Sequence, residues 1–235
     1  MAEFLLYSPQ VPQTPSMLCG RCRELLFADG VSISLASTSG LMASCVTGDE
    51  IASFEEIEFL LGEGPSLEAH HRGQAVYSSH RASDRLARWP ALSTATDHFG
   101  AWGVYAFPLK VGAARIGVLS LYDEAPSDPS SGALSDAIIV ADVVSHVVLS
   151  MQGNMPLGEI AMSFKENGAF RAEIHQASGM LAEQIGCGVA DALVQLRSRA
   201  YATERPVADL AIDVIAGRLR LVRSEDHDIE WSEGE

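Results

Sequence analysis

The side chains best suited to gripping phosphate or stacking on a nucleobase gather in the last third of the chain. The set combines arginines with a histidine, a glutamine and a tyrosine: Arg171, His175, Gln176, Arg197, Arg199, Tyr201, Arg205, Arg218 and Arg220. Guanidinium groups donate paired hydrogen bonds to phosphate oxygens, and His, Gln and Tyr can bind or stack on exposed RNA bases. On spacing alone, arginines that only solvate a helix surface are the commoner explanation, so RNA binding is one of two interpretations.

The charge balance limits how such a segment could bind RNA. The 235-residue chain has a formal net charge of −15, which opposes binding that rests on Lys and Arg displacing counterions. The acidic residues lie mainly elsewhere: residues 1–150 hold 8 basic and 17 acidic side chains, residues 151–222 hold 7 and 8, and residues 223–235 hold 1 and 6. Binding would therefore depend on a few arginines and on base contacts.

Other chemistry is weakly represented. The sequence shows no nucleophile–base motif, glycine-rich phosphate loop or paired catalytic carboxylates at telling spacing. Glu55, Glu56 and Glu58 have the pattern of a solvated helix face. Histidines in the first half are more typical of structural or solvated positions than of haem ligands; they are His70, His71, His80 and His98. We expect neither enzymatic activity nor a cofactor.

Four cysteines are too few and too scattered for a disulfide scaffold. Cys19-x-x-Cys22 could begin a zinc site, but no second ligand pair at matching spacing follows it. We expect these two side chains to point into a core, and we expect no bound metal.

The elements that would position the arginines are helices. Apolar residues recur with a helical period in three consecutive segments, residues 170–185, 189–202 and 206–219. Gly186 supplies a helix end and Pro206 a helix start, so three short helices should pack as a bundle. In the first, Arg171, His175 and Ser178 should share a polar face opposite the apolar stripe. Residues 223–235 form an acidic tail that we expect to be disordered.

The first 151 residues predict a different architecture. Alternation of apolar and polar residues indicates strands, whereas longer apolar periods indicate helices. The predicted order is a helix at 16–27, strands at 31–37 and 41–47, a helix from Ser53 to about 61, a strand at 74–79, a helix ending near residue 100, strands at 102–111 and 114–124, and a helix at 133–151. The short connections favour an α+β fold with a mostly antiparallel sheet flanked by helices.

The C-terminal pattern resembles the ANTAR family of transcription antitermination regulators over about 55 residues. The shared positions are Ala177 and Gly179 in the first helix, Ala192, Leu193, Leu196, Arg197 and Ala200 in the second, and Leu210 and Ala211 in the third. Ser178 departs from the family, which commonly has Lys there. The resemblance implies a three-helix module that binds stem-loop RNA. It implies RNA contacts from Arg171, His175, Gln176, Ser178, Gly179, Arg197, Arg199, Tyr201 and Arg205.

The N-terminal region is similar to GAF domains, notably those that precede ANTAR modules in actinobacterial proteins. The similarity rests on DGVSISL, GEGPSLEA, Trp89-Pro90 and the FPL…IGVLSLY strand pair. It implies a pocket for a small molecule of unknown identity, lined by Trp89, Trp102, Tyr105 and Tyr122. A domain that serves only for dimerisation is an equally good alternative.

Together these patterns predict an N-terminal extension at 1–15, a GAF-like sensor domain at 16–151, a linker or helix at 152–169 with a hinge at Met155-Pro156, an ANTAR domain at 170–222 and the acidic tail. The start has no basic region before its apolar run, and no apolar run of about 18 residues is uninterrupted, so we expect a cytoplasmic protein without membrane contact. The apolar period of residues 138–151 suits a parallel helix pair and predicts a homodimer. Two alternatives remain: a helix-turn-helix-like DNA binder, and a ligand-binding or protein-interaction regulator without RNA binding.

Overall fold

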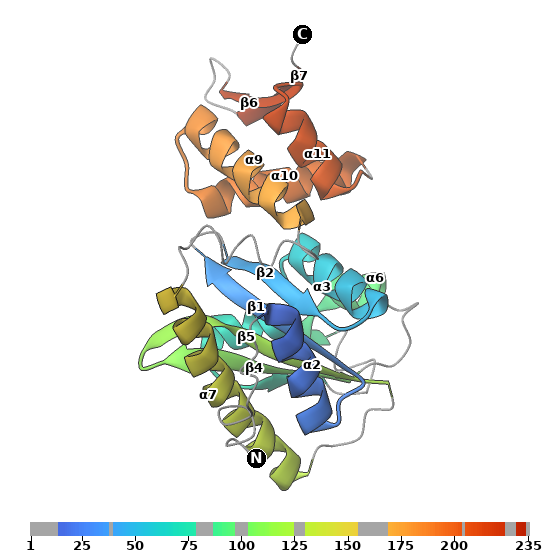
Figure 1. Ribbon diagram of the computed structural model, residues 1–235. Coiled ribbons are helices and arrows are strands. Elements are labelled where there is room, and N and C mark those ends of the chain that lie inside the picture. Colours follow the sequence, from blue (N-terminus) through green and yellow to red (C-terminus); the bar gives the residue numbers. More distant parts are fainter. Residues whose placement is uncertain are drawn as a thin grey trace. The chain divides into compact units, whose positions relative to one another are not determined.

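The structure is a computed structural model that describes residues 14–37, 40–78, 87–96, 103–124, 130–154, 169–203, 205–223 and 229–233. The chain divides into two compact units, one built from elements α2 to α7 and the other from α9 to β7 (Figure 1). The predicted hinge at Met155-Pro156 lies outside the described residues.

The first unit is built on a five-stranded sheet with the strand order β2-β1-β5-β4-β3. The pairs β1–β5, β4–β5 and β3–β4 are antiparallel. Because a hairpin at Gly112 joins β4 to β5, these two strands form the longest ladder of the sheet. The strands are β1 (Gly30–Ser37), β2 (Gly40–Val46), β3 (Val76–Tyr77), β4 (Gly103–Val111) and β5 (Ala114–Asp123).

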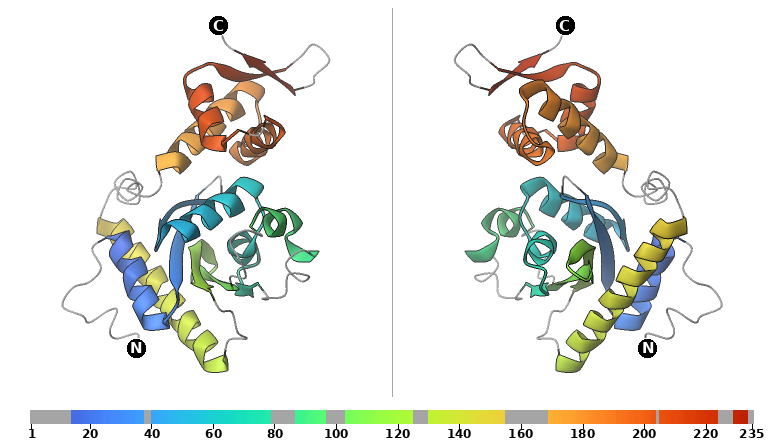
Figure 2. Two further views of the ribbon diagram at one scale, coloured as in Figure 1. Left: turned by 90° about the vertical axis from the view of Figure 1, so that its right-hand side faces the viewer. Right: turned by 90° about the vertical axis from the view of Figure 1, so that its left-hand side faces the viewer.

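One face of the sheet carries the apolar core beneath helices α2 (Pro15–Leu26) and α7 (Ser131–Asn154), as Figure 2 shows. Alternate residues of the strands point to this face. They include Ile33, Phe107 and Leu119, all at most 2% exposed. This buried apolar surface is the main stabilising contribution in the first unit.

The opposite face is covered by helices α3 (Asp49–Leu61), α4 (Pro65–Arg72) and α6 (Pro90–Ala95). The strand residues that point here are partly polar, as at Ser32, Ser34 and Ser120, yet all three are buried. The α+β fold class, with an antiparallel sheet flanked by helices and a helical C-terminal part, is therefore confirmed.

Several local expectations for this unit are wrong. Helix α3 begins at Asp49, ahead of the predicted start at Ser53, and Ser53 is an internal residue whose Oγ donates to the Asp49 carbonyl at 3.0 Å. Helix α4 is missing from the predicted order of elements, which has no helix between residue 61 and the strand at 74–79. Gly64 and Pro65 begin α4: Gly64 adopts a φ of 150°, and Pro65 occupies the first turn, where its missing N–H costs nothing.

The cysteines of α2 are buried in the core as expected, both fully. Cys19 also forms a disulfide with Cys45, which ties α2 to β2. Cys22 is a free thiol, and burial raises its pKa to about 12, so it is neutral. Among the described residues, no group of three His, Cys, Asp or Glu side chains is arranged to hold a metal ion.

Helix α7 is long and apolar enough to cross a membrane by length and composition. It lies instead against the sheet, and Val140, Val144 and Val148 are buried there. These contacts are those of a core helix of a folded domain.

The second unit consists of three helices and a hairpin: α9 (Ala169–Ile185), α10 (Val189–Thr203), α11 (Val207–Ile215), β6 (Leu219–Arg223) and β7 (Ile229–Glu233). The three helices bury the predicted apolar stripes at a common core that includes Ile174, Leu181, Leu196 and Leu210. Gly186 ends α9 with a φ of 65°, as expected.

The end of the chain differs from the prediction. The third helix stops at Ile215, and Gly217, with a φ of 76°, turns the chain into β6. From there Leu219 and Leu221 are buried while Arg220 and Val222 are exposed, which is the alternation of a strand rather than a helix. Part of the tail expected to be disordered forms β7, which pairs with β6 in the register Leu221↔Trp231.

Candidate nucleic-acid interface

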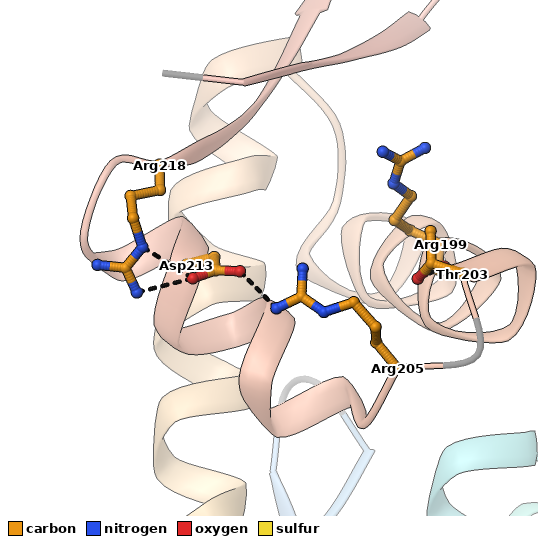
Figure 3. Close-up of polar contacts among 5 residues, drawn as sticks. All are labelled: Arg199, Thr203, Arg205, Asp213 and Arg218. Atoms are coloured by element: carbon orange, nitrogen blue, oxygen red, sulfur yellow. Dashed lines mark hydrogen bonds and ion pairs between the residues drawn. The ribbon is translucent and has the colours of Figure 1, made fainter. Parts of the chain in front are cut away.

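Two arginines from different loops meet at one carboxylate of α11. Arg205, in the loop before α11, donates from Nη2 to Asp213 Oδ2 at 2.7 Å (Figure 3). Arg218, just after α11, donates to Asp213 Oδ1 from Nε at 2.9 Å and from Nη2 at 2.7 Å. Asp213 therefore fixes both guanidinium groups on one side of the bundle.

The electrostatics of this cluster leave a surplus of positive charge. Hydrogen bonds first from Arg205 and then from Arg218 hold the pKa of Asp213 below its usual range, so its carboxylate stays ionised at neutral pH. Two guanidinium groups then face one carboxylate, and their side chains remain 47% and 58% exposed. A guanidinium has five N–H donors, so both arginines keep donors for a phosphate.

A third arginine lies beside an aromatic ring. The Cζ atom of Arg199, on α10, is 5.9 Å from the centre of the Trp231 ring of β7. Figure 3 shows the Arg199 side chain extending from α10, with no contact drawn between it and Asp213. Both Arg199 and Trp231 are half-buried.

The remaining predicted residues of α10 lie on another face. Arg197 and Tyr201 are four positions apart and therefore share one side of the helix. Tyr201 is 82% exposed, which leaves its ring open for stacking, and Arg197 is half-buried. The predicted arginines thus fall into two groups on either side of the buried Leu196 and Ala200 stripe.

Helix α9 presents its predicted residues unevenly. Gln176 is exposed and His175 is half-buried, whereas the side chain of Arg171 lies outside the described residues. Ser178 is fully buried, and its Oγ donates to the Ile174 carbonyl at 2.7 Å. The expected polar face therefore does not include Ser178, because Ser178 follows Ile174 by four residues and lies on the apolar stripe. A Cβ at Gly179 would meet no atom within 4 Å, so close packing does not require glycine there.

The aromatic residues expected to line a ligand pocket do not share one cavity. Tyr105 pairs with Leu121 and lines a pocket of about 180 Å³ beside α2 and α7. Tyr122 points to the opposite face, and Trp89 lines a separate cavity of only about 10 Å³, close to the minimum for one water molecule. Trp102 lies outside the described residues.

Buried polar side chains fill the face beneath α3 and α4. Glu55 accepts hydrogen bonds from Ser32 Oγ at 2.6 Å, Ser34 Oγ at 3.0 Å and the Tyr122 hydroxyl at 2.7 Å. Glu58 accepts from the Ser66 backbone N–H at 2.7 Å. Glu55 and Glu58 are 4% and 2% exposed, so the expectation of a solvated helix face is wrong for both and holds only for Glu56, which is exposed.

This burial changes the acidity of the network. Burial first, and the neighbouring Glu55 second, raise the pKa of Glu58 to about 8. Burial also raises the pKa of Tyr122 well above its usual range. At neutral pH the Glu58 carboxyl is therefore mostly protonated, which removes the cost of two adjacent buried negative charges.

Fold and site together define a two-part protein with a sheet domain and a helical module that carries exposed arginines. The ANTAR domain family matches residues 165–215, so the chain carries an ANTAR domain. ANTAR domains occur in RNA-binding regulators of transcription antitermination, in agreement with the sequence resemblance. Among curated proteins, none is similar enough to this chain to count as a match.

Solved structures similar to the chain include three bacterial domains. A domain assigned to a two-component sensor histidine kinase of Sinorhizobium meliloti 1021 has a TM-score of 0.48 at 16% identity, and the match covers 63% of this chain and 96% of that one. The GAF domain/HD domain protein of Geobacter sulfurreducens has a TM-score of 0.44 at 16% identity, covering 58% and 90%. The GAF domain of an Acinetobacter phosphoenolpyruvate-protein phosphotransferase has a TM-score of 0.44 at 16% identity, covering 66% and 92%.

Proposed function

We propose that this protein is a cytoplasmic, homodimeric regulator that binds stem-loop RNA through residues 170–222 and promotes transcription antitermination in response to a signal. The observation that supports it most is the pair of exposed guanidinium groups of Arg205 and Arg218, both held by Asp213 in the unit that contains the ANTAR match. Fixed guanidinium groups bind phosphate with less loss of side-chain entropy than free ones do.

Base contacts would supply the specificity that a chain of net charge −15 cannot draw from charge alone. The exposed ring of Tyr201 and the amide of Gln176 are the side chains suited to unpaired loop bases. Arg171, His175, Arg197 and Arg199 complete the proposed surface, which extends to both sides of the buried stripe of α10 because Arg197 and Arg199 lie on opposite sides of it. In this proposal Ser178 acts through the helix backbone, because its hydroxyl is buried.

The sensor domain would regulate this binding rather than catalyse a reaction. Its polar network fills the face beneath α3 and α4, and the pocket of about 180 Å³ near α2 and α7 lies on the other face. A small-molecule signal would bind on the α2–α7 side, where the cavity is larger than the one beside Trp89.

The test is a comparison of stem-loop RNA with duplex DNA in full-length protein. Arg197→Ala and Arg199→Ala should each weaken binding to an RNA of two tandem stem-loops by about 5- to 10-fold, as expected for loss of one charge-assisted contact. Arg21→Ala on α2, which removes a guanidinium paired with Glu24, is the matched control and should bind as the wild type does.

Three outcomes would contradict the proposal. Equal binding of duplex DNA would favour the DNA-binding alternative. Absence of wild-type binding to any stem-loop RNA would favour a regulator that acts through ligands or protein contacts. Unchanged affinity of both arginine variants would remove these residues from the site.

A further inference from the structure

The β6–β7 hairpin lies outside residues 165–215, the segment that the ANTAR family matches. It is nevertheless part of the folded second unit. Leu219 and Leu221 of β6 are 5% and 2% exposed, and the Leu221 backbone N–H donates to Gln184 Oε1 of α9 at 2.9 Å. The hairpin therefore holds a defined position on the helices (Figure 1).

Pairing register determines where the aromatic residue of β7 points. Trp231 lies directly opposite Leu221, so both side chains are on the face of the hairpin that meets the helices. Leu221 is buried against them, whereas Trp231, one strand further out, is only half-buried and reaches Arg199 of α10. The ring thus stands at the edge of the helical bundle, with part of its surface open to solvent.

Both positive and negative side chains lie near the Trp231 ring, and they favour different contacts with RNA. Arg199 lies beside the ring, and the net positive Arg205–Asp213–Arg218 cluster belongs to the same unit. Glu233 shares a face with Trp231, whereas Glu230 lies on the opposite face, as the register with Val222 shows. A carboxylate two positions along the same face of β7 disfavours a phosphate there but not an uncharged base.

From this arrangement we infer that Trp231 stacks on one unpaired loop base of the RNA. Arg199 then binds the adjoining phosphate. This contact extends the RNA-binding surface from the helices to the β6–β7 hairpin. The inference rests on the proposed RNA binding and adds a residue outside the matched domain. Stacking on an aromatic ring accepts any of the four bases, so this contact would add affinity rather than sequence choice.

The test uses full-length protein and a fluorescein-labelled RNA of two tandem stem-loops from the leader of a neighbouring operon. Trp231→Ala should weaken binding about 10-fold, the order expected for loss of one stacked base. Trp231→Phe, which keeps an aromatic face, should retain most of the affinity. Trp231→Leu, which keeps apolar packing without such a face, should lose as much as Trp231→Ala does.

The leucine variant separates stacking from a structural role. If Trp231 only supports the hairpin, Leu and Phe should bind equally well, and that result would overturn the inference. Val222→Ala, on the same hairpin but on its other face and 42% exposed, is the matched control and should bind as the wild type does.

A variant set in the RNA completes the test. Replacing the loop nucleotides one at a time with abasic sites should reveal one position that costs the wild type about 10-fold but costs Trp231→Ala nothing further, because coupled partners are not additive. Full additivity at every position would overturn the inference, as would tighter binding by Trp231→Ala, which would mean that the ring covers the site. Loss of RNA binding in the wild type would overturn the proposed function itself, so the two failures are distinguishable.

Discussion

At the residue scale, the first unit is distinguished by carboxyl groups in a place where burial is costly. Unpaired polar groups cost several kcal/mol when removed from water, unless hydrogen bonds replace the lost hydration. Glu55 has three such bonds from neighbouring hydroxyls, and Glu58 is bonded to the start of α4. The network therefore fastens α3 and α4 to the sheet through specific polar contacts rather than through apolar packing alone.

The raised pKa of Glu58 predicts a pH-dependent stability. Its pKa is about 8 in the folded protein and near its ordinary value of 4.5 in the unfolded chain. The folded state therefore holds this proton more tightly, and the stabilisation is complete below about pH 4.5 and is lost as the pH rises through 8. Within this window the group lowers the free energy of unfolding by up to about 1.4 kcal/mol per pH unit.

Glu58→Gln should remove this dependence, because an amide does not titrate and its oxygen can still accept the Ser66 N–H. Urea unfolding between pH 6 and 9 should show a flatter profile than the wild type does. Glu56→Gln, exposed on the same helix, is the matched control and should keep the wild-type slope. Identical slopes in all three proteins would contradict the assignment of the raised pKa to Glu58.

Burial of these glutamates could not be predicted from α3 alone, because acidic residues at such spacing usually face water. The strands, however, carry a pattern from which this burial could have been predicted. Ser32, Ser34, Ser120 and Tyr122 all lie on one face of adjacent strands. A row of hydroxyls on a face that must be covered requires a polar partner, and α3 was the nearest source of one.

At the element scale, regular periodicity predicted most of the fold. The long alternations gave β1, β4 and β5, and the helical stripes gave α7, α9 and α10, each with bounds close to those observed. The misses share a cause: α4 and the β6–β7 hairpin are short, and their stability comes from contacts with distant segments rather than from local pattern. The hairpin pairs Leu221 with Trp231, although β7 lies in the acidic segment 223–235, whose charge predicted disorder.

The same limit applied to the candidate site. Sequence patterning predicted the helix that carries Arg197 and Tyr201, of which Tyr201 is exposed and Arg197 is half-buried. It could not show that Asp213 gathers Arg205 and Arg218, since the three residues come from two loops and a helix. The inferred role of Trp231 depends on the register of the β6–β7 hairpin, and the sequence pattern did not predict this hairpin.

The prediction at the element scale concerns a dimer contact through helix α7. Its outer side presents Ile138 and Ile139, 56% and 49% exposed, in line with exposed Asp142 and His146. Val143 and Val147, which belong to the same predicted period, are buried against the sheet, so the exposed pair Ile138 and Ile139 is the part of that period left to contact a second copy of the helix. Ile138→Glu should convert a dimer to a monomer of the 25.1 kDa chain mass at micromolar concentration, as measured by light scattering.

Ile212→Glu offers a matched control for that variant, because Ile212 is 46% exposed on α11 of the other unit. It should leave the dimer intact. A wild-type monomer under the same conditions would contradict the homodimer, and a dimeric Ile138→Glu would place the interface on another surface.

At the scale of the whole molecule, the distribution of charge separates two tasks. Most of the acidic excess lies in residues 1–150 and 223–235, while residues 151–222 are nearly neutral. An acidic molecule is repelled by bulk nucleic acid, so random binding to RNA is weak. Only an RNA that supplies well-placed phosphates and unpaired bases should overcome this repulsion. The low positive charge of the protein should therefore increase its selectivity among RNAs.

This balance predicts a shallow dependence of RNA affinity on salt. With three or four arginine–phosphate contacts, single-stranded loops should give a slope of log K against log salt of about −2 to −3. Raising the salt from 50 to 200 mM should then weaken binding about 20- to 50-fold, as measured by fluorescence anisotropy on the stem-loop RNA.

Arg199→Ala should reduce the slope by about 0.7, which is the contribution of one phosphate contact, whereas Trp231→Ala should leave the slope unchanged because stacking releases no counterions. A slope much steeper than −5 would mean that binding is driven by a broad basic surface, and equal slopes for the arginine variant and the wild type would mean that Arg199 contacts no phosphate.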